Sequence, residues 1–397
     1  MTIPGADREI EEHALLSGPE AGDLLAAALA TDGLQLGQWK VHSLHHRPGA
    51  GVTVGYIVHL AGVDSAIPPL YLYATTAKLT VPDAAAVHLT SSDGYEVHVW
   101  RHPFDPELPA WSVACDATQL GARIGPVASV EVLAYRPTRR GVVRAVLAGP
   151  PTETVYVKIV RPGRGEGLTT RHQILVDAGI PAPAVLYSDE TGLAVFAAGT
   201  GKSLAELLVE GLEIENGPET AERVFSTLVA TLDALPANLL DLPIRPAWAE
   251  RVDHYAHAAT TVLPDQAARI AVLVDEIRHQ MATSDAGPLV PTHGDFYEAN
   301  VLMEPDLVQP RVRTLLDLDT VGPGRRVDDL ACLLAHISVL PDLAPEQYRH
   351  VPTIQKVWTK ASYPLVDRAN LHARAAAVVL SLVSGVRPTD PRAEELA

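Results

Sequence analysis

The sequence predicts an α+β protein, with strand-rich segments first and helices later. Residues 39–197 contain repeated apolar, β-branched and aromatic runs, separated by turns rich in Gly, Pro and Asp. Residues 204–384 carry Leu and Ala at helical spacing. Two short apolar runs between 290 and 317 each end in an aspartate. At 397 residues the chain has room for two or three domains.

The first part of the chain is predicted to fold as a separate domain over residues 1–120. Residues 19–32 have helical spacing, with Leu24, Leu25, Ala28 and Leu29 on one face. Strand-like runs follow at 39–46, 52–60, 70–74, 86–90 and 95–100. The segment 102–109 contains three prolines and is predicted to lead out of this region in an extended conformation.

A weak internal similarity relates residues 41–73 to residues 132–158. Arg47-Pro48 matches Arg136-Pro137, and Tyr73 stands where the second copy has Lys158. The pattern indicates either a repeat or two unrelated hairpins. If it is a repeat, the first copy lacks the lysine and cannot form a second nucleotide site.

The second strand-rich region centres on Lys158. Strands are predicted at 130–135, 141–147 and 154–160, a helix at 168–176, and a hairpin from 185–187 and 193–197. Lys158 alternates with apolar residues in TVYVKIV, and an ammonium group in such a strand needs an anionic partner. The alternative is an edge-strand lysine that points to solvent.

The last part of the chain is predicted to be mainly helical. Helices are expected at 204–208, 218–235, 247–283, 326–340 and 367–384. Within 247–283, the aromatic and histidine side chains are predicted to pack rather than to face a substrate.

Residues 290–331 carry the chemistry. Asp295 ends the first apolar run, Asn300 follows it by five positions, and Asp317 ends the second run. Two carboxylates with an amide between them suit a phosphotransferase that uses ATP and Mg²⁺. Asp295 would accept the proton of an attacking hydroxyl, and Asn300 and Asp317 would hold Mg²⁺ on the nucleotide phosphates.

This stretch resembles the aminoglycoside phosphotransferase and choline kinase superfamily. The resemblance rests on His-Gly-Asp, four residues, Asn, then Asp317, Gly322 and Asp329-Leu330-Ala331. It implies a protein-kinase-like fold of two lobes: an antiparallel-sheet N-lobe at 121–200 and a helical C-lobe at 201–397. Residues 1–120 would then be an N-terminal α/β cap domain, similar to that of maltokinase-like and glucosamine-kinase-like sugar kinases.

The resemblance also implies roles for residues around the nucleotide. Lys158 would contact the ATP phosphates. Glu166 is the candidate partner for it, although it lies just before a predicted helix that contains no glutamate. Arg140, in a turn region whose single glycine is Gly141, would help to hold phosphate. The alternative is a solvated arginine in a hairpin turn.

Four further residues of the central stretch have predicted roles. Glu298 and Asp319 are candidates for substrate binding, and Asp319 is also a candidate for the metal shell or a turn cap. His293 is predicted to orient the loop, and Asp329 to anchor it through buried hydrogen bonds or to cap the following helix.

These features predict a kinase that phosphorylates a hydroxyl of a small molecule, namely a sugar, an amino sugar or an aminoglycoside. The alternative is a non-catalytic pseudokinase that binds nucleotide, which the missing helix glutamate and the glycine-poor turn favour. No HExxH, G-x-S-x-G or GxxxxGK[ST] pattern occurs, which argues against zinc hydrolases, serine hydrolases and P-loop enzymes.

Composition narrows the partners and the compartment. A formal charge of −17 argues against nucleic acid as a partner. Two distant cysteines give no disulfide framework, and no signal peptide or apolar run of about 20 residues is present. The sequence therefore predicts a cytoplasmic protein, monomeric or homodimeric, with no membrane association.

Overall fold

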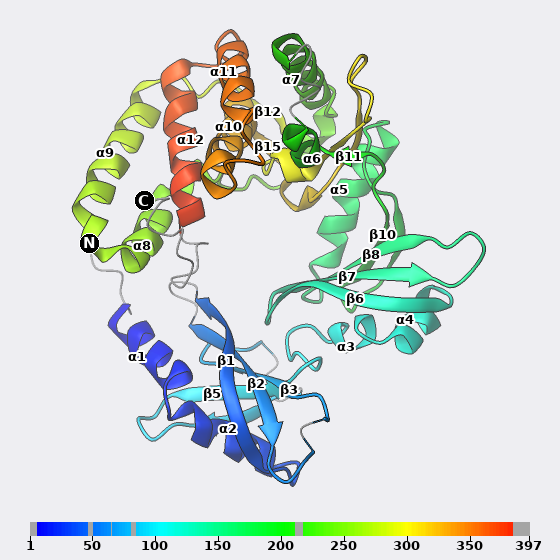
Figure 1. The fold of residues 1–397 in the computed structure, drawn as a ribbon, viewed down its shortest axis with the longest axis vertical. Coiled ribbons are helices and arrows are strands. Elements are labelled where there is room, and N and C mark those ends of the chain that lie inside the picture. The colour runs from blue at the N-terminus through cyan, green and yellow to red at the C-terminus, as the bar shows by residue number, and fades with distance from the viewer. Residues whose placement is uncertain (1–5, 47–50, 65, 81–84, 211–216, 384–397) are drawn as a thin grey trace. The chain divides into compact units, whose positions relative to one another are not determined.

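Figure 1 shows the computed structural model of the chain, which describes residues 6–46, 51–64, 66–80, 85–210 and 217–383. The chain forms two compact units. Unit 1 comprises Met1–Thr169 and Val185–Ala198, and unit 2 comprises Thr170–Ala184 and Gly199–Ala397. One crossing between them lies inside helix α5 (Gly165–Asp177).

Unit 1 begins with a five-stranded antiparallel sheet of order β1-β2-β3-β5-β4. Its strands are β1 (Leu36–His46), β2 (Val52–Leu60), β3 (Leu70–Thr75), β4 (Val87–Thr90) and β5 (Glu96–Arg101). Helices α1 (Ala6–Ser17) and α2 (Ala21–Ala30) share one hydrophobic core with this sheet. The five predicted strands are confirmed. Helix α1 was not predicted, because three glutamates interrupt its few apolar residues and leave no clear apolar face.

The second sheet of unit 1 has the order β6-β7-β8-β10-β9 and is also antiparallel. Its strands are β6 (Val127–Arg136), β7 (Arg140–Leu147), β8 (Thr154–Val160), β9 (Val185–Ser188) and β10 (Leu193–Ala197). Helices α3 (Trp111–Ala114) and α4 (Ala117–Ile124) precede it and share its core. Neither helix was predicted; Asp116 caps α4 by accepting hydrogen bonds from the N–H groups of Thr118 and Gln119.

The two sheets have the same strand order, and each is preceded by a pair of helices. Tyr73 occupies the place in β3 that Lys158 occupies in β8, because each lies between two neighbouring strands with its flanking residues turned to the helix-covered core. The two similar segments of the sequence therefore lie at equivalent places in two sheets of the same strand order, and Arg47-Pro48 lies outside the described residues.

Unit 2 is mainly helical. Its α-helices after α5 are α6 (Leu204–Val209), α7 (Gly217–Asp233), α8 (Val252–Val262), α9 (Ala267–Thr283), α10 (Arg326–Leu343), α11 (Val351–Ser362) and α12 (Arg368–Val383). Short 3₁₀ turns are η2 (Ala237–Asp241), η3 (Ala249–Arg251), η4 (Pro264–Gln266), η5 (Glu298–Asn300) and η6 (Leu318–Thr320). The helix expected over 247–283 is broken at Pro264, which cannot donate the backbone hydrogen bond of a helix interior.

Two small antiparallel sheets carry the central stretch of the chain. One pairs β12 (Leu289–Thr292) with β15 (Gly322–Arg325). The other has the order β11-β13-β14, with β11 (Lys202–Ser203), β13 (Val301–Met303) and β14 (Val312–Leu315). In the described part of the chain, no helix is both long enough and apolar enough to cross a membrane.

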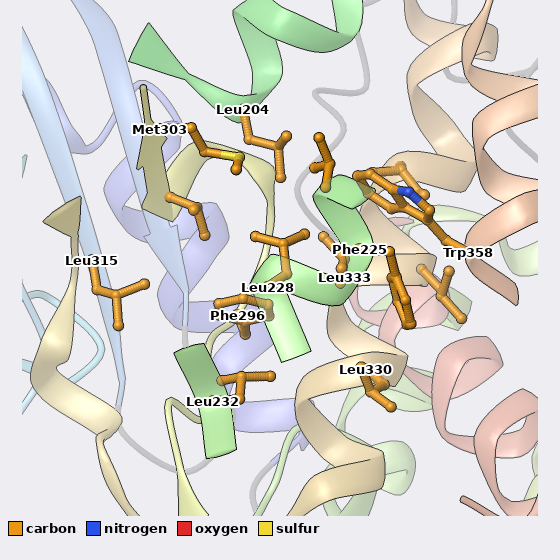
Figure 2. Packing of buried hydrophobic residues seen from close by; sticks show 14 of the residues in the cluster. Leu204, Phe225, Leu228, Leu232, Phe296, Met303, Leu315, Leu330, Leu333 and Trp358 are labelled. Atoms are coloured by element: carbon orange, nitrogen blue, oxygen red, sulfur yellow. The ribbon is translucent and has the colours of Figure 1, made fainter. Parts of the chain in front are cut away.

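One large hydrophobic core joins β13 and β14 to helices α6, α7, α10 and α11 of unit 2. Figure 2 shows side chains of α6, α7, α10 and α11 converging on Phe296, Met303 and Leu315 from the central stretch. Phe296 is fully buried and directly follows Asp295. Burying such a ring stabilises the fold by about 1.5–3 kcal/mol, so the loop that carries Asp295 is anchored to the rigid part of the unit.

Candidate active site

Strand pairing brings the two aspartate-bearing loops together. Thr292 pairs with Gly322 in one ladder, and Val301 pairs with Leu315 in the other. Residues 293–300 and 316–321 are therefore held side by side between two ladders. The N–H of Leu316 donates to the carbonyl of Asn300 at 2.8 Å, which continues the second ladder into the loops.

His293 and Asp329 fix the loop that carries Asp295. The carboxylate of Asp329 accepts hydrogen bonds from the N–H groups of His293 (3.0 Å) and Gly294 (2.8 Å), and it is fully buried. Its predicted role as an anchor is confirmed. The His293 ring lies between Leu316 and Asp295: Nε2 lies 2.9 Å from the carbonyl oxygen of Leu316, and Nδ1 accepts the N–H of Asp295 at 3.3 Å.

Burial shifts the titration of both anchoring groups. It lowers the pKa of His293 to about 4, so the ring is neutral at pH 7, donates through Nε2 and accepts through Nδ1. The predicted orienting role of His293 is confirmed by these bonds. Burial raises the pKa of Asp329 to about 7, although its two backbone hydrogen bonds favour the ionised form.

Asn300 is tied to Asp295 through the backbone. Its Nδ2 donates to the carbonyl oxygen of Asp295 at 2.9 Å, and the side chain is buried. Because the nitrogen end of the amide is engaged in this way, the oxygen end is the one that can serve as a metal ligand. The Asp295 carboxylate is half-buried, with Oδ1 3.9 Å from Sγ of Cys332.

Asp317 adopts a left-handed backbone conformation, with φ +49°, at the start of η6. Non-glycine residues in this region cost about 1–2 kcal/mol and are concentrated at functional sites. The segment behind it is held by two arginines. Nη1 of Arg245 donates to the carbonyl of Asp319 at 2.5 Å, and Nε of Arg171 donates to the carbonyl of Val321 at 2.9 Å.

Glu298 begins η5, in the loop that carries Asp295. It is only 5% exposed, and among the described residues its Oε2 has no hydrogen-bond partner. Burial raises the pKa of Glu298 to about 7. The sequence predicts that Glu298 contacts the substrate, whereas in the structure the protein itself covers most of this side chain. Asp319 is half-buried, so the two candidates differ in their access to solvent.

Unit 1 presents Lys158 and Arg140 on one face of the second sheet. Lys158 pairs with Val142 of β7 and Ala194 of β10, and Arg140 lies two positions before Val142. Side chains two apart on a strand share a face, so Arg140 and Lys158 do so. Strand β8 is the third of five and Lys158 is half-buried, which excludes the alternative of an edge-strand lysine.

Glu166 lies in the first turn of α5, not ahead of it, because the helix begins at Gly165, three residues earlier than predicted. Leu168 packs α5 on the Lys158 face of the sheet, against Ala194 and Phe196. Glu166 is exposed, and residues two apart on a helix point in nearly opposite directions. Its pairing with Lys158 stays a prediction.

The glycine of the predicted phosphate turn has a packing role. A Cβ on Gly141 would lie 2.2 Å from a ring carbon of Trp111, so the indole needs the empty space. Gly141 is the second residue of β7, so the turn between β6 and β7, at residues 137–139, contains no glycine.

Several residues of the site carried no local sequence signal. Cys332 on α10 contacts Asp295 from 37 positions away. Tyr297 stacks on His336 with 4.1 Å between ring centroids. Tyr255 was expected to pack and does so, within a core formed by α8, α9 and α12. These contacts depend on tertiary packing, which spacing along the chain does not reveal.

A family model described as a phosphotransferase enzyme family matches residues 143–353, a little over half of the chain. The chain belongs to this family. It is thus a small-molecule phosphotransferase of the aminoglycoside phosphotransferase and choline kinase superfamily, as the sequence predicted. The antiparallel second sheet followed by a helical unit agrees with the predicted protein-kinase-like α+β fold.

Solved structures similar to this phosphotransferase include an aminoglycoside-3'-phosphotransferase of type VIII, with 21% identity, 64% of this chain and 93% of that chain covered, and a TM-score of 0.43. The aminoglycoside phosphotransferase APH(3'')-Id from Streptomyces rimosus has 17% identity, coverages of 66% and 96%, and a TM-score of 0.41. An ethanolamine kinase of Plasmodium vivax has 13% identity, coverages of 65% and 75%, and a TM-score of 0.39. These scores carry no argument about the substrate. No curated protein matches the sequence significantly.

Proposed function

We propose that this phosphotransferase transfers the γ-phosphate of Mg-ATP to a hydroxyl of a small molecule, namely a sugar, an amino sugar or an aminoglycoside. One observation carries the proposal. Asp295, Asn300 and Asp317 stand on two adjacent loops. The Asn300–Asp295 hydrogen bond closes the first loop, the Leu316–Asn300 hydrogen bond joins the two, and Asp329 anchors the first. Catalysis of phosphoryl transfer is mostly positioning and charge neutralisation, which such a framework favours.

Asp295 would act as the general base. Its carboxylate would accept the proton of the acceptor hydroxyl, a contribution of about 10²–10⁴ in rate. His293 supports this role by holding the N–H of Asp295, and Phe296 by anchoring the next residue in the core.

Asn300 and Asp317 would hold Mg²⁺. An amide oxygen and a carboxylate are the hard oxygen ligands that this ion takes, and Mg²⁺ usually completes its shell with phosphates and waters. This fits the described residues, in which no group of three or more His, Cys, Asp or Glu side chains could hold a metal by itself. Bound Mg²⁺ would neutralise the phosphate charge.

Lys158 and Arg140 would bind the phosphates of ATP from the sheet face that they share. Glu166, in the first turn of α5, would pair with Lys158. Glu298 and Asp319 are the proposed acceptor contacts, and the net charge of −17 is compatible with an amine-bearing acceptor. We further propose that residues 1–120 form a cap domain and that the enzyme works in the cytoplasm as a monomer or homodimer.

A turnover assay tests the proposal. ADP release is followed with Mg-ATP and a panel containing glucose, glucosamine, an aminoglycoside and choline. Asp295→Ala should lower kcat by about 10²–10⁴ and Asp317→Ala should abolish Mg-ATP-dependent turnover. Asp306→Ala, an exposed aspartate of the β13–β14 connection, is the matched control and should leave kcat unchanged.

Two results would contradict these assignments. Turnover close to wild type in Asp295→Ala would remove the base, and activity retained in Asp317→Ala would remove that residue from the metal shell. Binding of Mg-ATP without turnover on any acceptor would favour the pseudokinase alternative.

A further inference from the structure

The turn between β6 and β7 is held by residues that lie before the second sheet in the chain. Asp105 belongs to the segment that leads out of the first sheet, and it is 3% exposed. Its Oδ2 accepts the N–H of Thr138 at 2.7 Å and the hydroxyl of Tyr135 at 2.6 Å. Its Oδ1 accepts the N–H of Glu107 at 2.8 Å, so donors occupy both oxygens.

Thr138 is the residue that needs this support. It stands in the middle of the turn with φ +61°, a left-handed conformation that is a genuine outlier for a β-branched residue. Its carbonyl is held as well as its N–H: Nε of Arg161 donates to the carbonyl oxygen at 2.6 Å. Arg161 in turn pairs with the buried Glu107 at 3.2 Å.

Aromatic packing holds Tyr135, whose hydroxyl donates to Asp105. The Tyr135 ring stacks on Trp111, with 4.8 Å between centroids, and meets Tyr73 of the first sheet edge to face at 5.2 Å. Tyr73 itself stacks on Trp100. The face of the first sheet that corresponds to the Lys158 face therefore packs against the residues that hold the turn.

We propose that Asp105 is a positioning residue for the nucleotide phosphates: it holds Thr138 in its left-handed conformation, so that the β6–β7 turn is presented to ATP as a rigid element. The inference rests on the proposed function. A glycine-rich turn adapts to the phosphates on binding, whereas this turn (residues 137–139) contains no glycine and its strained residue, Thr138, is held at both backbone polar groups.

Nucleotide binding to the full chain tests the role of Asp105. Calorimetric titrations of wild type and Asp105→Ala use Mg-ATP and, separately, adenosine. Asp105→Ala should raise the Kd for Mg-ATP about tenfold, the effect of one hydrogen bond to a charged group, and change the Kd for adenosine less than twofold. Asp116→Ala is the matched control, because Asp116 also accepts two backbone N–H groups but caps α4 instead of the turn.

Two further variants keep the test decisive. Asp105→Ala combined with Thr138→Gly should recover at least half of the lost affinity on a logarithmic scale, because glycine takes the left-handed conformation without strain. If Asp105→Ala does not fold, Arg161→Lys keeps the positive charge, loses the Nε contact with Thr138, and should weaken Mg-ATP binding two- to fivefold.

The outcomes separate the inference from the proposed function. A wild-type chain that does not bind Mg-ATP contradicts the proposed function itself. A wild-type chain that binds Mg-ATP, together with a folded Asp105→Ala variant of equal affinity, or with equal losses for Mg-ATP and adenosine, overturns the positioning role. An unchanged Kd in Arg161→Lys overturns it in the same way.

Discussion

His293 and Asp329 are hydrogen-bonded neighbours in the site, and burial shifts their pKa values in opposite directions. The folded pKa of His293 is about 4, against 6.5 for an unperturbed histidine, so the unfolded chain binds more protons in that range. Stability from His293 is therefore lost as pH falls from 6.5 to 4, by up to about 3 kcal/mol. Asp329 has its pKa raised from 3.8 to about 7, so in the same range the folded protein binds more protons and gains stability as pH falls.

We expect the free energy of unfolding of Asp329→Asn to show the pH dependence that comes from His293. The variant loses the offsetting proton uptake, so its free energy of unfolding should fall more steeply than that of wild type between pH 7 and pH 4. Urea unfolding at several pH values measures this, with the exposed Asp306→Asn as the control. Wild-type and Asp329→Asn curves that stay parallel across this range would contradict the prediction.

At the residue scale, the sequence predicts contacts where the signal is local. Asp295, Asn300 and Asp317 belong to two loops that short strands hold side by side, and their roles in catalysis and metal binding stay predictions. The contact of Asp105 with Thr138 spans 33 positions, and that of Cys332 with Asp295 spans 37. Nothing in either segment indicates its partner, because burial and chain reversal create the contact.

At the scale of elements, the β6–β7 hairpin was predicted but the helix that packs on it was not. Trp111 belongs to α3, a four-residue helix that follows the segment 102–109, for which the sequence predicts an extended conformation. The indole is fully buried and its ring fills the space above Gly141. From the sequence, Gly141 is the single glycine of the predicted phosphate-turn region, and the packing of Trp111 against it explains why a glycine stands there.

We expect Gly141→Ala to destabilise the protein markedly. The added Cβ would lie 2.2 Å from a Trp111 carbon, closer than any side-chain contact allows, so the indole or the strand must move. Overpacking of this kind costs about 1–3 kcal/mol. Urea unfolding measures the change, with Gly149→Ala as the control because a Cβ there meets no atom within 4 Å. A Gly141→Ala variant as stable as Gly149→Ala would show that Trp111 can move without cost.

At the scale of the whole molecule, the chain contains two sheets of one topology with different residues at the equivalent position. The strand order of neither sheet could be inferred from the sequence. In each sheet the last strand along the chain lies next to the third strand, and the fourth strand is at the edge. The equivalence of Tyr73 and Lys158 could be inferred from the sequence, because it depends only on aligning two short segments of the chain. The equivalent positions differ in chemistry: the second sheet has the ammonium group of Lys158, and the first has the buried phenol of Tyr73 stacked on Trp100.

This difference predicts one nucleotide per chain. The second sheet places Lys158 on the face opposite its helix-covered core, whereas the equivalent position of the first sheet is Tyr73, and phosphate binding needs a positive charge there. The equivalent face of the first sheet is occupied by Tyr73, Trp100 and Tyr135. Calorimetric titration with Mg-ATP should give a stoichiometry of one, Lys158→Ala should weaken binding at least tenfold, and Tyr73→Phe, which keeps the ring stack, should leave affinity and stoichiometry unchanged. A stoichiometry of two, or full affinity in Lys158→Ala, would show that the first sheet has kept a nucleotide site despite its aromatic face.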